Sequence, residues 1–228
     1  MPSKPLNSYS PFGQMLALIR KDFLLEYRQR STLSGILLYV VSTTFIVYNV
    51  LGQAVGAAVW GGFFWVVLLF ASVNAVAKSF VQENPEQQLY YYLLASPSAI
   101  ILSKIIYNTG LLWLISLLAL FVFGGMLGYP IANSPLFLGT IALGGLGFSI
   151  TFTFVSAIAS KTAQNATLMA ILSFPIVIPT LLVLMRLTKI AANLMTDTAY
   201  YKDIVILLSI DTILLSLVLI LFPYLWRD

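Results

Sequence analysis

Long, uninterrupted apolar stretches separated by short polar segments dominate the pattern of this sequence. A helix that crosses a membrane needs roughly 20 predominantly apolar residues. Six stretches are long enough, and they lie at residues 33–53, 58–77, 98–127, 136–159, 164–186 and 204–225. Their apolar residues run continuously, whereas a membrane β-barrel would show alternation with a period of two. The pattern predicts an all-α polytopic membrane protein with six transmembrane helices, in one membrane domain over residues 1–228.

Residues 1–31 have a different, amphipathic pattern. Apolar residues recur there at spacings of three or four, which places on one helical face Phe12, Leu16, Ile19, Phe23 and Tyr27. The other sides carry basic residues, namely Arg20, Lys21, Arg28 and Arg30. A helix of this kind lies in the plane of the membrane interface. We therefore expect an interfacial helix, and the alternative is a tail that serves only to set topology.

The placement of basic residues predicts the orientation in the membrane. Cytoplasmic loops carry an excess of Lys and Arg. If the N-terminus is cytoplasmic, six spans leave only Arg186, Lys189 and Lys202 outside, and the other nine of the 12 basic residues inside. We expect both termini in the cytoplasm.

The segment 78–97 joins the second and third spans on the expected cytoplasmic side. It contains Glu83 and Glu86, followed by an apolar, tyrosine-rich run that includes Tyr91, Leu93 and Leu94. Apolar helices of this kind dock in grooves of partner proteins. We interpret the segment as a short coupling helix, and an ordinary solvated loop is the alternative.

Two Ser-Pro pairs predict where spans begin. Serine is a good N-cap and proline suits the first helical position, so Ser96-Pro97 and Ser134-Pro135 should start the third and fourth spans. A helical spacing of apolar residues continues through 187–203, where we expect a separate interfacial helix on the outer face. Tyr200 and Tyr201 would lie at the headgroups there.

Composition excludes several classes of function. The chain is 60% hydrophobic and only 9% charged, with a mean hydropathy of +0.94, whereas roughly a quarter of the residues of an average globular protein are charged. Its partner is membrane lipid, and no basic run interleaved with aromatics points to nucleic acid. Cysteine and histidine are absent, which excludes disulfides, Cys or His metal sites and Ser-His catalysis. The chain also lacks a phosphate-binding Gly-x-x-x-x-Gly-Lys motif.

Three features inside the spans are candidates for function. Pro175 and Pro179 should kink the fifth span, either as a functional bend or as a lipid-facing kink without a role. Asp211 is an intramembrane charge, which is either functional or joins helices as a partnered or protonated group. Small-residue packing is predicted weakly for Gly52/Gly56 and Gly124/Gly128, and more strongly for the fourth-span glycines Gly139, Gly144, Gly145 and Gly147.

The whole chain resembles the haem exporter protein B family. The elements that carry the resemblance are the basic segment 28–31 (Arg-Gln-Arg-Ser), residues 92–97 (Tyr-Leu-Leu-Ala-Ser-Pro), residues 101–104 (Ile-Leu-Ser-Lys) and residues 172–179 (Leu-Ser-Phe-Pro-Ile-Val-Ile-Pro). The Leu-Leu-x-Ser-Pro element is shared with export permeases of the ATP-binding cassette (ABC) type. The Pro-x-x-Ile-Pro element is narrower. Tyr91 stands where family members often carry glutamate, which makes this docking segment less acidic.

The resemblance implies an ABC permease subunit for cytochrome c maturation in the bacterial inner membrane. It implies a homodimer, an ATP-binding subunit docked on the cytoplasmic side, a haem-handling membrane subunit and a periplasmic haem chaperone. ATP hydrolysis would drive either haem export or release of the haem-loaded chaperone. The permease itself would be no enzyme. Haem iron is usually held by His, Cys, Met or Tyr, so the chain alone binds no cofactor and a partner would supply the stronger ligands.

Three other functions fit the same architecture. One is an ABC permease that exports a lipid, glycan or drug, and another is a membrane scaffold that transports nothing. The third is a membrane enzyme, which is disfavoured because His and Cys are absent and no span holds a pair of carboxylates.

Overall fold

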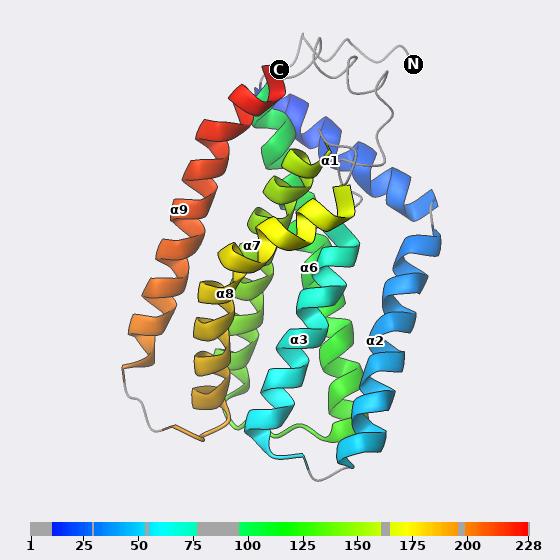
Figure 1. Ribbon diagram of the computed structural model, residues 1–228, viewed down its shortest axis with the longest axis vertical. Helices are drawn as coiled ribbons and strands as arrows, with labels where there is room; N and C mark the ends of the chain where they lie inside the picture. Colours follow the sequence, from blue (N-terminus) through cyan, green and yellow to red (C-terminus); the bar gives the residue numbers. More distant parts are fainter. Residues whose placement is uncertain are drawn as a thin grey trace.

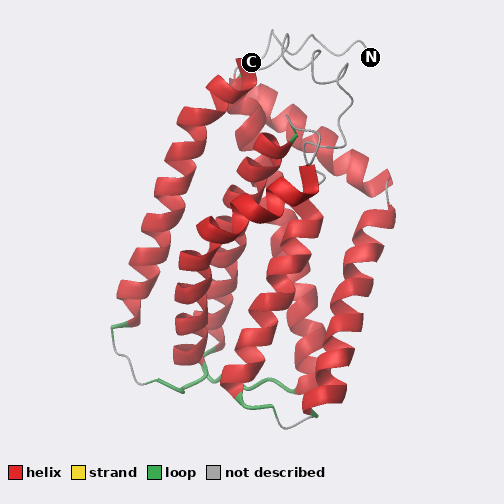
Figure 2. Cartoon of the chain, in the orientation of Figure 1, coloured by secondary structure: helices red, strands yellow, loops and turns green. Residues whose placement is uncertain are grey.

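The computed structural model describes residues 11–28, 30–52, 55–76, 96–160, 165–195 and 199–227. These residues form seven helices and no strand (Figure 2). Six of the helices are long and apolar enough to cross a membrane. The fold class predicted from the apolar pattern is confirmed.

The helices follow the predicted stretches closely. They are α1 (Pro11–Arg28), α2 (Arg30–Leu51), α3 (Ala57–Val76), α6 (Pro97–Leu127), α7 (Ser134–Ala159), α8 (Asn165–Ala191) and α9 (Tyr200–Arg227). Figure 1 shows α1 lying obliquely across one end of the bundle, where α6 begins and α9 ends. The other end holds the start of α3 and the end of α8. We refer to these as the α1 end and the opposite end.

Helix α7 is the central helix of the bundle. It packs against α3, α6, α8 and α9, and most of its residues are buried. Close packing is possible because three glycines present backbone where a side chain would stand. A Cβ added at Gly144 would lie 2.9 Å from Leu184, and one at Gly145 would lie 2.7 Å from Trp113. In lipid, small residues of this kind let helices approach and gain van der Waals contact.

Two buried hydrophobic clusters hold the ends of the bundle together. At the α1 end, Leu18 packs with residues of α6, α7 and α9, among them Ile101, Phe154 and Phe222. Toward the opposite end, Trp60 stacks on Phe64 with ring centroids 5.2 Å apart, and further aromatic residues surround this pair: Phe123, Tyr129 and Phe137. The helix ends are therefore fixed by packing on both sides of the membrane domain.

Two expectations about helix termini have different outcomes. Ser96 is the N-cap of α6 and its side chain accepts a hydrogen bond from the Ala99 amide, as predicted. The prediction for Ser134 is wrong. Asn133 is the N-cap of α7, and its Oδ1 accepts from the Leu136 amide at 3.1 Å. Asn133 accepts from the amide three residues later, as an N-cap serine would. The N-cap therefore lies one residue before Ser134, and Ser134 is the first helical residue.

The separate interfacial helix expected at 187–203 is also wrong. Helix α8 continues through Ala191, and Leu187, Ile190 and Ala191 are buried in its last turns. The amides of Ala132 and Asn133 donate to the Ala191 carbonyl at 3.0 and 2.8 Å, which caps the end of α8. Tyr200 and Tyr201 are exposed in the first turn of α9. The apolar residues after 186 therefore belong to the last turns of α8, which is longer than predicted and packs against its neighbours.

The weaker glycine pairs do not bring helices together. No heavy atom lies within 4 Å of a Cβ added at Gly52, Gly56, Gly124 or Gly128, and the same holds for Gly139. Gly52 and Gly128 instead have positive φ angles of 73° and 80°. They follow the ends of α2 and α6, where this conformation favours glycine. The prediction of close contact is confirmed only for Gly144, Gly145 and Gly147.

Candidate functional site

Helix α1 is fixed to the beginning of α6 by polar contacts. Gln14 accepts a hydrogen bond from the Ser96 amide through Oε1 at 3.3 Å. Leu18, one turn later on the same face, is buried at 5% exposure. Asp22 follows after another turn and is 7% exposed. The buried face of α1 is therefore Gln14, Leu18 and Asp22, and the cap of α6 is held by a second helix.

Asp22 connects the two helices by an ion pair. Its Oδ1 lies 3.5 Å from Lys104 Nζ on α6 and 3.2 Å from Lys21 Nζ. Lys104 and Asp22 are both almost completely buried. Removing one partner of a buried pair leaves a charge without compensation, which is strongly destabilising. Asp22 was not among the residues predicted from the sequence. Gln14, Leu18 and Asp22 are spaced by four residues and so lie on one face of the helix. This spacing could have indicated a second, protein-facing side of α1.

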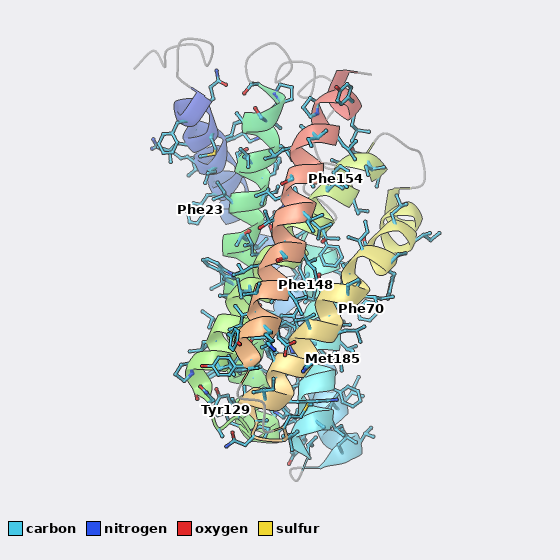
Figure 3. The ribbon with its side chains drawn as sticks, turned by 90° about the vertical axis from the view of Figure 1, so that its left-hand side faces the viewer. Phe23, Phe70, Tyr129, Phe148, Phe154 and Met185 are labelled. Atoms are coloured by element: carbon cyan, nitrogen blue, oxygen red, sulfur yellow. The ribbon has the colours of Figure 1, made fainter. Side chains whose placement is uncertain are left out.

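The remaining surface of α1 has the amphipathic character that the sequence predicted. Phe12, Leu16 and Phe23 are exposed, at 69%, 59% and 62%, and Phe23 lies at the outer edge of the molecule (Figure 3). Arg20 is also exposed. The oblique course of α1 and its exposed apolar side chains are the features of a helix lying in the membrane interface. The side chains of Tyr27, Arg28 and Arg30 are outside the described residues.

The predicted coupling residues are mostly outside the described part of the chain. This applies to Glu83, Glu86, Tyr91, Leu93 and Leu94, and their role stays a prediction. The two described residues are Ser96 and Pro97, which are the N-cap and first residue of α6. They lie at the same end of the bundle as α1 and the last residues of α3 (Figure 1).

Helix α8 is bent near its two prolines. Figure 1 shows its first half crossing the bundle obliquely before the second half turns parallel to α7. Pro175 and Pro179 lie inside the helix and their side chains are exposed. A cavity of about 50 Å³ lies beside the bend, between α3, α7 and α8. Phe70 of α3 lines it and packs edge-on against Phe174, with centroids 6.5 Å apart (Figure 3).

Asp211 lies deeper in the bundle than the predicted sixth span, 204–225, suggested, because that span placed it only seven residues from the outer end. Because α9 begins at Tyr200, Asp211 is the twelfth of its 28 residues, about 17 Å from the start of the helix. It is 3% exposed and faces Gly147 of α7. Phe148, the next residue of α7, lies about halfway between the two ends of the molecule (Figure 3).

Neither carboxyl oxygen of Asp211 has a hydrogen-bond partner among the described residues. The same is true of the Thr180 hydroxyl on α8, whose side chain faces the same glycine. Asp211 therefore joins no helices through a polar contact in the described structure. The Thr180 hydroxyl therefore does not satisfy a backbone carbonyl freed by Pro175 or Pro179.

Several other polar side chains of the core have partners within the bundle. Ser149, which follows the glycines of α7, donates to the Ile105 carbonyl at 2.8 Å and is completely buried. Asn108 donates to Thr153 at 2.8 Å. At the opposite end, Arg186 Nε lies 3.1 Å from Asp203 Oδ2, an ion pair without a well-aligned hydrogen bond to that oxygen. Trp65 donates to Thr188 at 2.8 Å. Asp211 differs from these groups because neither of its carboxyl oxygens has a hydrogen-bond partner in the described structure.

Within the described residues, no group of three His, Cys, Asp or Glu side chains could hold a metal ion. The polar features are single buried groups and pairs.

Comparison with protein families decides to which family the chain belongs. The sequence model of the CcmB protein family matches residues 13–224, from the first turn of α1 almost to the end of α9. The chain belongs to the CcmB protein family. This is the haem exporter protein B family that the sequence resembled. Among curated proteins, no match was found.

Membership in the CcmB family makes the chain a multi-pass membrane component of the haem export system for cytochrome c maturation. Its role there is that of a transporter permease subunit and not of a catalytic enzyme. A permease of this system works within a haem exporter complex, which includes membrane and ATP-binding partners. The match spans most of α1 as well as the six spanning helices.

Proposed function

We propose that this CcmB chain couples ATP hydrolysis by a partner subunit to haem export or to release of a haem-loaded chaperone. The observation that carries the proposal is the attachment of α1 to the start of α6. Gln14 holds the amide of Ser96, and Asp22 holds Lys104 two turns further along α6. The segment between α3 and α6 therefore leads into a helix that is fixed to its neighbour from its first residue.

A rigid attachment is what a coupling segment needs. A force applied by an ATPase to residues 78–97 would be lost if α6 began with a frayed turn. Here the start of α6 is capped by Ser96 and bonded to α1, so a displacement would move α1 and α6 as one body. Buried, hydrogen-bonded contacts of this kind transmit small shifts because packed interfaces do not deform continuously.

Haem would be handled together with other subunits. The chain has no His and no Cys, which are the stronger ligands of haem iron. We therefore infer that haem, if it contacts this subunit, lies at an interface where a haem-handling membrane subunit or a periplasmic chaperone supplies the ligands. A homodimer of the permease with an ATP-binding subunit on the α1 side is the arrangement we propose.

The test is a triple variant in the coupling segment, Tyr91→Asp, Leu93→Asp and Leu94→Asp. Three carboxylates would remove the apolar contact surface, so the ATPase should no longer co-purify with the chain and cytochrome c should not mature. Membrane insertion should be unchanged, because the segment lies between spans.

A matched control places charges on exposed apolar residues at the opposite end. Leu194 and Met195 are 49% and 42% exposed, and Leu194→Asp with Met195→Asp should leave ATPase co-purification intact. If the triple variant still co-purifies with the ATPase, the coupling surface lies elsewhere. If the parent protein binds an ATPase but cells that lack this chain still mature cytochrome c normally, the chain serves another substrate.

A further inference from the structure

We propose that Asp211 is an intramembrane proton-binding site, held neutral where α7, α8 and α9 meet, and that it releases its proton only when this junction opens. The proposal concerns the chain by itself and goes beyond the coupling function above. It is carried by the packing around Gly147 and by the absence of any polar partner for Asp211 in the described structure.

The junction is built around the missing side chain of Gly147. A Cβ at this position would lie 2.5 Å from Asp211 Oδ1 and 3.3 Å from Thr180 Cγ2. The carboxyl group of α9 therefore lies directly against the backbone of α7, with Thr180 of α8 beside it. Both side chains are almost completely buried, at 3% and 1% exposure.

The two other acidic residues whose side chains the structure describes show what Asp211 lacks. Asp22 lies near two lysine ammonium groups, and Asp203 lies 3.1 Å from Arg186. Asp211 forms no ion pair or hydrogen bond with any described residue. Helix α7 carries no titratable side chain. The other helices packed against α9 are α6 and α8, and their titratable groups are Lys104, Tyr107, Arg186 and Lys189.

None of these groups compensates a charge on Asp211. Lys104 is engaged with Asp22, and Arg186 is engaged with Asp203 near the opposite end. An ionised carboxylate buried without a partner is far more costly than a neutral carboxyl group, so such a group takes up a proton. The packing at Gly147 therefore selects the protonated form of Asp211.

The bend of α8 lies at the same level as this site. Pro179 directly precedes Thr180, which faces Gly147 beside Asp211. A proline removes one backbone hydrogen bond and makes a helix easier to bend at that point. Movement of α8 about the prolines would separate Thr180 from Gly147 and admit water to the carboxyl group. Proton release is thereby linked to the position of α8.

Infrared spectroscopy of the purified full-length chain in lipid nanodiscs tests the protonated state. A protonated carboxylic acid gives a carbonyl band separate from those of carboxylates and amides. We expect this band at neutral pH in the parent protein, its loss in Asp211→Asn, and its retention in Asp203→Asn. Asp203 is the matched control because it is an equally buried aspartate of α9 that has a cationic partner.

Absence of the band in the parent protein at neutral pH would overturn the proposal, whatever the variants do. Its persistence in Asp211→Asn would assign the proton to another residue and would overturn it as well. If Asp211→Asn does not fold, Asp211→Leu provides a second neutral variant. These results need no ATPase or haem, so they are independent of the coupling function.

Transfer into D2O tests the link to α8, because exchange of O–H for O–D shifts the band to lower wavenumber. We expect a slow shift in the parent protein and a slower one in a variant with Pro175→Ala and Pro179→Ala, whose straightened helix opens less often. An immediate shift in the parent protein, or equal rates in both proteins, would show that the bend does not control access to Asp211.

Discussion

Gly147 lies where side chains of α8 and α9 meet the backbone of α7. It is one of three glycines of α7 that each face a different neighbour: Gly144 faces Leu184 and Trp65, Gly145 faces Trp113, and Gly147 faces Asp211 and Thr180. A single helix thereby approaches α3, α6, α8 and α9 at nearly the same height. No substitution at these positions can be accommodated without moving a neighbouring side chain.

We expect Gly147→Ala to destabilise the folded protein by about 1–3 kcal/mol, the usual cost of overpacking a filled core. The added methyl group would displace Asp211 and press against Thr180. Thermal unfolding of the purified protein in nanodiscs measures the effect.

Gly139→Ala is the matched control on the same helix. No heavy atom lies within 4 Å of its added Cβ, so alanine should be neutral or stabilise α7 by up to about 1 kcal/mol through its better helix propensity. Equal destabilisation by both substitutions would mean that the glycine backbone matters at these positions and that the contact with Asp211 does not.

At the scale of the helix, α8 shows what the sequence could and could not predict. Pro175 and Pro179 are recognisable in the sequence because proline disrupts a helix whatever surrounds it. The end of α8 was not recognisable, because its cap comes from the amides of Ala132 and Asn133, nearly 60 residues away. A contact of that sequence separation leaves no local signal, and the apolar spacing after residue 186 therefore suggested a separate element.

Helix α1 illustrates the same distinction. Its apolar face, which includes Phe12, Leu16 and Phe23, was predictable because apolar residues recur at helical spacing along the whole lipid-facing side. The protein-facing side, with Gln14 and Asp22, depends on where Ser96 and Lys104 lie in space. Asp211 lies between these cases, since the sequence placed it inside a span but not at its full depth, and the absence of a partner depends on the packing of three helices. Local patterns thus predict the membrane-facing surfaces, whereas the polar contacts between helices require the fold.

The bend of α8 provides a prediction at this scale. Replacing Pro175 and Pro179 with alanine should straighten the helix and gain up to about 3 kcal/mol of helix propensity at each site. We expect cytochrome c maturation in cells to fall sharply all the same, with the amount of folded protein in the membrane unchanged, because the bend gives α8 its freedom to move. The measurement is the level of mature cytochrome c relative to the amount of this chain.

Pro223→Ala is the control for loss of a proline from a spanning helix. Pro223 lies inside α9 near the α1 end, away from the bend of α8. Maturation should continue in this variant. Normal maturation in the double variant of α8 would show that the bend contributes shape alone.

For the whole molecule, the arrangement of helix ends makes the orientation testable. The six spanning helices bring α1, the start of α6 and the end of α9 to one end, and the chain segments around Val55, Ile131 and Met195 to the other (Figure 1). Arg20, Lys21 and Lys104 lie at the α1 end, whereas Arg186, Lys189 and Lys202 lie toward the opposite end.

Both termini should therefore be cytoplasmic, because nine of the 12 basic residues are then inside and cytoplasmic loops are the positively charged ones. Topology reporters fused after Val55, Ile131 and Met195 should all read periplasmic, and a reporter after Asp228 should read cytoplasmic. The C-terminal fusion is the control for expression and folding. A cytoplasmic signal at any of the three internal sites contradicts the six-span topology, and a complete inversion of all four signals would place the α1 end, with its attachment of α1 to α6, on the periplasmic side, where no ATPase could reach it.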